Sequence, residues 1–206
     1  MRIGIVGAGN VGRLYGRAWI GRGHDVAFSY ARDTAALAAF VASCGERASA
    51  VAVEEVAAQS DVIVFSPPFE RIDDAAARLG SVAGKTVIDT TNPFNPERTG
   101  LVDLGGSTAV ARVVELLPGA HLVKALHNLS VQQAETAMTG DPAAVFVASD
   151  RADAADTAGR LIIDAGLLPF SMGDLASARW SEAPGPLFMN VYGLSEVSAA
   201  VAQLRA

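Results

Sequence analysis

The sequence has few of the residues that bring special chemistry. It contains one cysteine among 206 residues, so no internal disulfide can form, and this is typical of a reducing compartment. We expect Cys44 to be a small, buried hydrophobic residue. The three histidines, His24, His121 and His127, do not have the spacing of metal ligands, so no metal site is predicted. His24 is expected to be structural and His121 exposed.

Charge and long apolar runs are also scarce. Charged residues make up 18% of the chain and the net charge is -6, which argues against a nucleic-acid or membrane-surface partner. No stretch reaches the roughly 18 apolar residues of a membrane span. Because the first predicted strand begins at Arg2, no signal peptide is expected. We therefore expect a cytoplasmic protein that acts on a small molecule.

Short apolar runs alternate with alanine-rich helical segments. Strands are predicted at Arg2–Val6, Asp25–Tyr30, Ala48–Val51, Val62–Ser66, Thr86–Asp89, His121–Ala125, Ala144–Ala148 and Leu167–Phe170. Helices are predicted to begin near Asn10, Thr34, Val53, Arg71, Ser107, Val131, Ala152 and Asp174. Such alternation predicts an α/β fold: a Rossmann-type, doubly wound, mainly parallel sheet with right-handed crossovers and a short C-terminal helical segment. We expect one domain over residues 1–206, with the strand and helix of residues 167–206 completing the substrate cleft.

Two further stretches have distinctive compositions. Residues 90–107, TTNPFNPERTGLVDLGGS, predict a long loop that follows the strand ending at Asp89, at the edge where this fold binds ligands. The closing residues predict an amphipathic helix whose apolar face either packs on the sheet or forms a dimer interface. That face consists of Leu187, Val191, Leu194, Val197, Val201 and Leu204.

A glycine motif, GAGNVG, follows the first predicted strand and opens a helix, which is the context of a dinucleotide-binding loop. Gly7 would allow the tight turn, Gly9 the approach of the pyrophosphate, and Gly12 the close packing of helix on strand. The free amides at the start of that helix, around Asn10 and Val11, would hold the phosphates.

The tip of the second predicted strand indicates which dinucleotide binds. An NAD site places a carboxylate here, whereas this chain offers Ser29, Tyr30 and Arg32. Arginine and hydroxyls can hold a phosphate, so the tip predicts NADP(H). The alternative is that Arg32 is a solvated surface charge and that Asp33 reaches the ribose.

Several segments together resemble one known family. MRIGIVGAGNVG, DVIVFSPPFERIDDAAARL, GKTVIDTTNP, HLVKALHNLS and GLLPFSMGDLASARWSEAPGPLFMNV are similar to segments of the coenzyme F420-dependent NADP oxidoreductases. The resemblance implies an enzyme, a homodimer, that transfers hydride between NADP(H) and a deazaflavin, coenzyme F420. The family usually ends its second strand in Ser-Arg, whereas the matching pair here is Tyr30-Ala31, with Arg32 one residue later.

The resemblance also implies positions for parts of the ligand. The turn of Ser66, Pro67 and Pro68 would lie beside the adenosine or the pyrophosphate-ribose part of NADP(H). Without backbone donors, the two prolines would act through shape and apolar contact. Asn92 and Pro93 would lie near the nicotinamide.

The sequence leaves two interpretations for each of two polar residues near the sheet edge, Lys124 and His127. His127 follows a strand and is expected to face the cleft, where it either contacts a ring or supplies a proton, or else caps the next helix as a structural residue. Lys124 is either a cleft cation or a structural partner. Trp180, Phe188 and Met189 are expected to be core residues.

Alternative functions remain at this point. The acceptor could be a flavin, a ferric chelate, an imine or a small carbonyl, or the protein could be a non-catalytic NADP(H) sensor. Imine reductases and hydroxyacid dehydrogenases add a helical domain of about a hundred residues, and only some 30 residues follow Gly173 here.

Overall fold

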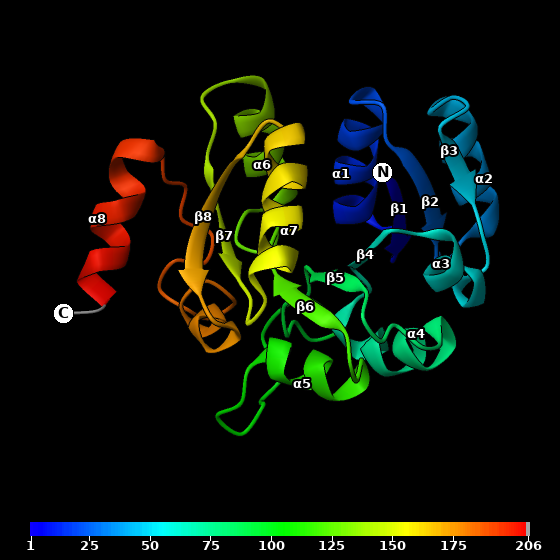
Figure 1. The fold of residues 1–206 in the computed structure, drawn as a ribbon. Helices are drawn as coiled ribbons and strands as arrows, with labels where there is room; N and C mark the ends of the chain where they lie inside the picture. Colours follow the sequence, from blue (N-terminus) through cyan, green and yellow to red (C-terminus); the bar gives the residue numbers. More distant parts are fainter. Residues whose placement is uncertain (205–206) are drawn as a thin grey trace.

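One eight-stranded sheet forms the centre of the molecule, with strand order β3-β2-β1-β4-β5-β6-β7-β8 (Figure 1). The computed structural model describes residues 1–204, so the last two residues of the predicted 1–206 domain lie outside the described residues. The strands are β1 (Arg2–Val6), β2 (Asp25–Ser29), β3 (Ala48–Ala50), β4 (Val62–Phe65), β5 (Thr86–Asp89), β6 (His121–Lys124), β7 (Ala144–Ala148) and β8 (Leu168–Gly173). All neighbouring strands are parallel except β6 and β7, so the predicted doubly wound, mainly parallel sheet is confirmed.

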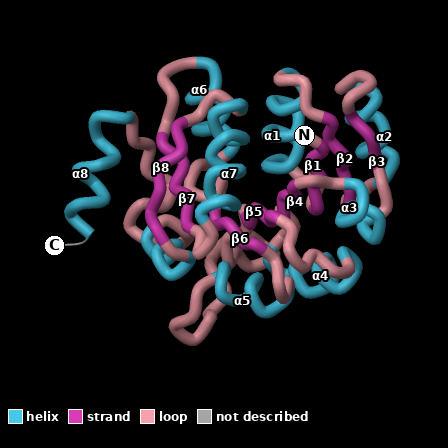
Figure 2. The backbone as a smooth tube through the Cα atoms, viewed as in Figure 1, coloured by secondary structure: helices cyan, strands magenta, loops and turns pink. Residues whose placement is uncertain are grey.

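Helices cover both faces of this sheet (Figure 2). Their bounds are α1 (Asn10–Gly21), α2 (Thr34–Ser43), α3 (Val53–Gln59), α4 (Ile72–Leu79), α5 (Ala109–Leu116), α6 (Val131–Thr139), α7 (Ala152–Asp164) and α8 (Leu194–Leu204), with 3-10 helices η1 (Phe69–Arg71) and η2 (Leu175–Trp180). The buried core on one face includes side chains of α1, α2, α6 and α7, and the core on the other includes α3, α4, α5 and α8. Because both faces are covered, β4 and β7 are apolar and buried along their whole length.

Most predicted elements start where expected, and the differences lie at their ends. The second strand ends at Ser29 because Tyr30 has a left-handed backbone, with φ of 55°. The last strand extends to Gly173 and not only to Phe170. The helix predicted near Ser107 begins at Ala109, where the Thr108 side chain caps it.

The closing helix is shorter than predicted. It begins at Leu194, so Leu187 and Val191 lie in irregular chain before it. The helix begins after Gly193, whose amide donates to the Glu196 carboxylate at 3.1 Å and whose carbonyl oxygen accepts from the Val197 amide at 3.1 Å. Val197 and Val201 are buried against the sheet, and Figure 1 shows α8 beside β8 at the outer edge of the molecule. The prediction that this face packs on the sheet is therefore confirmed for these two residues.

Some single-residue predictions are also decided. His24 is buried and bonds the Met1 amine and the Asp164 carboxylate, so its structural role is confirmed. Cys44 is only half-buried, because it lies at the exposed C-terminal end of α2, and its predicted burial is wrong. Met189 is 45% exposed and is not a core residue. Among the helices described, none is long and apolar enough to cross a membrane.

Candidate functional site

The glycine loop joins β1 to α1 and packs against its neighbours without space for side chains. Gly7 has φ of 107°, and a Cβ on it would lie 2.3 Å from backbone atoms of Ser66. A Cβ on Gly12 would lie 2.4 Å from the Gly7 carbonyl oxygen. The turn and the close packing predicted for these two glycines are both present, and only glycine fits at either position.

Gly9 differs from its neighbours because a Cβ placed on it would meet nothing within 4 Å. It is the N-cap of α1, so the first-turn amides of Asn10, Val11 and Gly12 have no carbonyl one turn earlier to bond. Helix N-termini with free amides bind phosphate groups. An open approach at Gly9 next to these amides fits the diphosphate of a dinucleotide.

The two hydroxyls at the tip of β2 have partners within the protein. Ser29 is 1% exposed and donates its hydroxyl hydrogen to the Ile5 carbonyl oxygen at 2.9 Å. The Tyr30 hydroxyl donates to the Asp74 carboxylate at 2.6 Å. Burial, and then Asp74, raise the pKa of Tyr30 to about 12, so this hydroxyl keeps its proton. Both hydroxyl hydrogens are therefore used within the protein, and the contact of Ser29 and Tyr30 with a phosphate stays a prediction.

Two charged residues, Arg32 and Asp33, follow the tip of β2, and only the side chain of Asp33 is bonded within the part of the chain that the structure describes. Arg32 is exposed and has no hydrogen bond or ion pair with any residue that the structure describes. The Asp33 carboxylate accepts from the Ala36 amide at 2.9 Å and caps α2. The cap uses one oxygen of Asp33, whereas none of the donors of Arg32 bonds a described residue, so Arg32 is the residue that can donate to a phosphate.

The Ser66-Pro67-Pro68 turn follows β4 and closes over the glycine loop. The Ser66 amide donates to the Val6 carbonyl oxygen at 2.7 Å, which holds the turn against the end of β1. Pro67 is buried, and Pro68 is the N-cap of η1. The turn therefore lies beside Gly7, as its predicted role at the dinucleotide requires, and its contact with the ligand stays a prediction.

Asn92 connects the loop after β5 to two distant segments. Its amide nitrogen donates to the His127 carbonyl oxygen at 2.8 Å, and its amide oxygen accepts from the Ala183 amide at 2.9 Å. Both polar atoms are thus bonded within the protein. Asn92 remains partly exposed beside the buried Pro93, so its predicted place near a nicotinamide stays a prediction.

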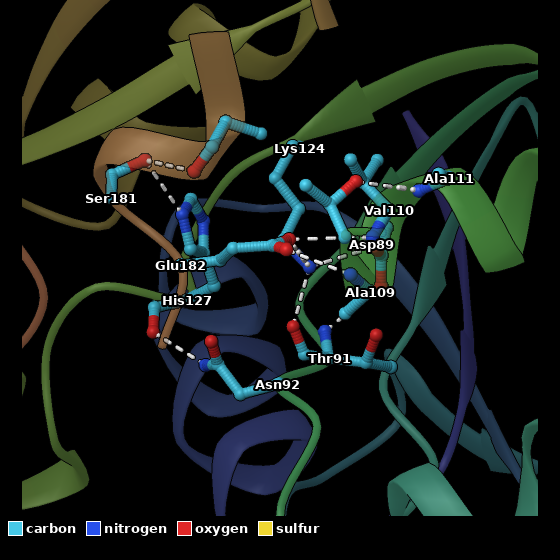
Figure 3. Close-up of polar contacts among 12 residues, drawn as sticks. Asp89, Thr91, Asn92, Ala109, Val110, Ala111, Lys124, His127, Ser181 and Glu182 are labelled. Carbon is cyan, nitrogen blue, oxygen red and sulfur yellow. Dashed lines mark hydrogen bonds and ion pairs between the residues drawn. The ribbon is translucent and has the colours of Figure 1, made fainter. Parts of the chain in front are cut away.

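A buried ion cluster lies at the carboxyl ends of β5 and β6 (Figure 3). The Lys124 ammonium lies 2.9 Å from the Asp89 carboxylate and 3.5 Å from that of Glu182, and it donates to the Thr91 carbonyl oxygen. Glu182 also accepts from the first amides of α5, those of Ala109 and Val110. Lys124 is therefore a structural partner and not a free cleft cation.

His127 lies next to this cluster and is 3% exposed, so the prediction that it faces an open cleft is wrong. Its Nε2 atom lies 2.9 Å from the Ser181 hydroxyl (Figure 3), and Nδ1 has no partner among the described residues. Burial, and then the Lys124 charge, lower the pKa of His127 well below its usual 6.5. The ring is neutral near pH 7, and this favours the structural alternative over proton supply.

A cavity of about 490 Å³ opens beside the ion cluster. The long loop before α5, together with η2 and the segment after it, forms its walls. Its lining residues are Pro93, Leu101, Val102, Asp103, Leu104, Gly106, Ser107, Thr108, Arg179, Glu182, Ala183 and Pro184. Its size is that of a small-molecule site, and it lies where doubly wound sheets bind ligands.

Glu182 and Asp89 were not recognised as site residues from the sequence. A signal existed for Asp89, because Asp89 and Lys124 end two apolar strands that proved to be neighbours, in register with each other. Glu182 comes from a turn far along the chain, and local sequence patterns carry no signal for such a contact.

The family model "NADP oxidoreductase coenzyme F420-dependent" matches residues 2–93, which include the glycine loop, the tip of β2 and the Ser66-Pro67-Pro68 turn. The match covers 92 of the 206 residues, which form the predicted dinucleotide-binding part of the chain. The name of this family describes oxidoreductases that use NADP and coenzyme F420.

Other similarities extend over more of the chain. Metalloreductase STEAP3 of Rattus norvegicus is 26% identical over 183 residues, which are 88% of this chain and 36% of that protein, so the chain spans about a third of that relative. A hypothetical protein from Sinorhizobium meliloti is 25% identical, with a TM-score of 0.81 over 93% of this chain and 95% of that one. A proposed F420-dependent NADP reductase from Arthrobacter sp. FB24 is 23% identical, with a TM-score of 0.76 over 86% of each chain. The last likeness concerns the fold alone.

Proposed function

We propose that this protein belongs to the F420-dependent NADP oxidoreductase family and transfers hydride between NADP(H) and a deazaflavin, coenzyme F420. The observation that carries the proposal is the family match over the very segments that build the open cradle at Gly9. The cavity beside the ends of β5 and β6 supports it, because a second ring system could bind there.

The nucleotide would lie along the carboxyl edge of the sheet. Gly7, Gly9, Asn10, Val11 and Gly12 would hold the diphosphate through amides and open space. The turn after β4 would flank the adenosine side. Asn92 and Pro93 would then lie near the nicotinamide, and Pro93 also lines the cavity.

The cavity lining offers both apolar and charged contacts to an acceptor. Leu101, Val102 and Leu104 supply apolar wall, and the first two are exposed although they are large hydrophobic residues. Arg179 supplies a cation, and its guanidinium lies 4.7 Å from the centre of the Trp180 ring, which restricts its position. Because Arg179 and Glu182 come from the segment after β8, residues 167–206 would complete the substrate cleft within a single domain.

Bound NADPH supplies the hydride itself, and the protein holds donor and acceptor close and aligned. His127 needs no proton role here, because it is neutral and buried. The ion cluster of Asp89, Lys124 and Glu182 would fix the two cavity walls, since it ties the end of β5 to the segment after η2 and to α5.

A homodimer is also proposed, on the ground of the apolar residues before and at the start of α8. Met189, Val191 and Leu194 are 45%, 51% and 73% exposed. Exposed apolar residues gathered in one segment are typical of an interface.

The proposal is tested by mixing pure protein, NADPH and oxidised coenzyme F420 and following the loss of deazaflavin absorbance. We expect turnover with F420 and little with FMN, FAD or ferric chelates in parallel reactions. The chelates and flavins form the second candidate, because the similarity to a metalloreductase covers 88% of the chain. Turnover of these acceptors but not of F420 would replace the proposal, and NADPH binding without any turnover would indicate a sensor.

A further inference from the structure

Arg13 is the fourth residue of α1, and its side chain returns to the glycine loop. Its Nε atom donates to the Ala8 carbonyl oxygen at 2.9 Å. Its guanidinium also lies 4.9 Å from the centre of the Phe40 ring, on α2. The side chain is half-buried, so one hydrogen bond and one aromatic ring fix the position of this cation.

The place where Arg13 is fixed adjoins the tip of β2. The amides of Gly7 and Ala8 both donate to the Ser29 carbonyl oxygen, at 3.1 and 3.2 Å. Ala8 therefore bonds both residues: its carbonyl oxygen accepts from Arg13, and its amide donates to Ser29, the last residue of β2. In this fold the adenosine ribose binds at that tip, so a phosphate on its 2′-oxygen would lie between the glycine loop and the start of α2.

Arg13 also has unused donors. A guanidinium carries five N–H groups, and Ala8 uses one of them. The two terminal nitrogens form no hydrogen bond or ion pair with the residues described. The hydroxyls of Ser29 and Tyr30 are already bonded, so the chain needs another donor near Arg32 if it is to grip a 2′-phosphate.

We propose that Arg13 is a specificity-determining residue that binds the 2′-phosphate of NADP(H) together with Arg32. Arg13 would hold the phosphate in place of the Ser29 and Tyr30 hydroxyls, whose hydrogens already bond within the protein. Planar guanidinium groups bind phosphate through paired, charge-assisted hydrogen bonds, which fits the free edge of Arg13. This inference rests on the proposed function, since it assumes that NADP(H) binds at the glycine loop.

The chain offers a matched control in Arg17, one turn further along α1. Its guanidinium lies 5.1 Å from the centre of the same Phe40 ring, and its hydrogen bond goes to Ser43 and not to the glycine loop. Arg13→Gln and Arg17→Gln therefore remove the same charge from the same helix, at different distances from Ala8. Arg13→Lys, which keeps the charge and loses the planar edge, is a further variant if Arg13→Gln does not fold.

Dissociation constants are measured by calorimetry for NADPH, NADH, adenosine 2′,5′-bisphosphate and AMP. Arg13→Gln should weaken the two 2′-phosphorylated ligands by roughly 10- to 50-fold, in keeping with the loss of charge-assisted hydrogen bonds, and change the other two less than about 3-fold. Arg17→Gln should change all four less than about 3-fold. For Arg13→Lys, the dissociation constants of the two 2′-phosphorylated ligands should lie between those of Arg13→Gln and those of the unaltered protein.

If Arg13→Gln weakened the binding of ligands with and without a 2′-phosphate equally, the inference would fail. Arg13 would then only stabilise the glycine loop through its hydrogen bond to Ala8. If Arg13→Gln and Arg17→Gln weakened the binding of the 2′-phosphorylated ligands equally, the inference would also fail. The loss would then come from the long-range effect of removing one positive charge and not from a contact of Arg13 with the phosphate. If the unaltered protein does not prefer NADPH to NADH, the proposed cofactor itself fails. If that preference exists and survives in Arg13→Gln, only the assignment of Arg13 fails.

Discussion

Replacing Gly9 with valine should abolish NADPH binding while the protein stays folded. The backbone at Gly9 has φ of -83°, which valine can adopt, and a Cβ there meets no protein atom within 4 Å. The branched side chain would instead fill the space that the diphosphate needs beside the first amides of α1. Losing two or more charge-assisted hydrogen bonds corresponds to a dissociation constant at least about 100-fold larger. Calorimetric titration with NADPH measures this change.

The control for Gly9→Val lies at the other end of the same helix. Gly21 is the last residue of α1, and a Cβ there also meets nothing within 4 Å. Gly21→Val should bind NADPH as the unaltered protein does, and both variants should keep the same far-ultraviolet circular dichroism. Normal NADPH binding by Gly9→Val would mean that the glycine loop is not a phosphate cradle.

Replacing Lys124 with methionine should destabilise the protein by about 3–5 kcal/mol, the usual cost of leaving buried charges without their partner. Methionine nearly matches the length of lysine, so packing changes little. The carboxylates of Asp89 and Glu182 would then share a buried site without a cation. Urea denaturation gives the free energy of unfolding for this comparison.

An exposed ion pair provides the matched control for Lys124. Arg47 and Asp25 lie 2.9 Å apart, with side chains 53% and 61% exposed. Arg47→Met removes one positive charge from a pair in water, so the urea midpoint should hardly move. If Lys124→Met were no less stable than Arg47→Met, the buried cluster would not hold the cavity walls together.

The order of elements was predictable because short, mostly apolar runs alternate with helical segments along the chain. β1, β5 and β7 have their predicted ends, since parallel strands covered on both faces leave a clear signal in the chain. The glycine loop was predictable for a different reason. Gly7 and Gly12 are required by contacts inside one short turn, so local sequence contains all the information.

The parts that could not be predicted depend on contacts between distant segments. Residue type alone does not show that the Ser29 hydroxyl bonds Ile5, or that Tyr30 turns toward Asp74 on α4. His127 looked like a cleft residue because it follows a strand, yet Ser181 and its neighbours cover it. The cavity likewise arises only when the loop after β5 meets the segment after η2.

NADP(H) dependence is the claim on which the proposed reaction and the role of Arg13 both rest. Its most direct test is a parallel calorimetric titration of the unaltered protein with NADPH and with NADH in one buffer. An exposed, unpaired Arg32 and a fixed Arg13 near the tip of β2 predict that NADPH binds at least about 10-fold more tightly. Equal or tighter binding of NADH would contradict the account.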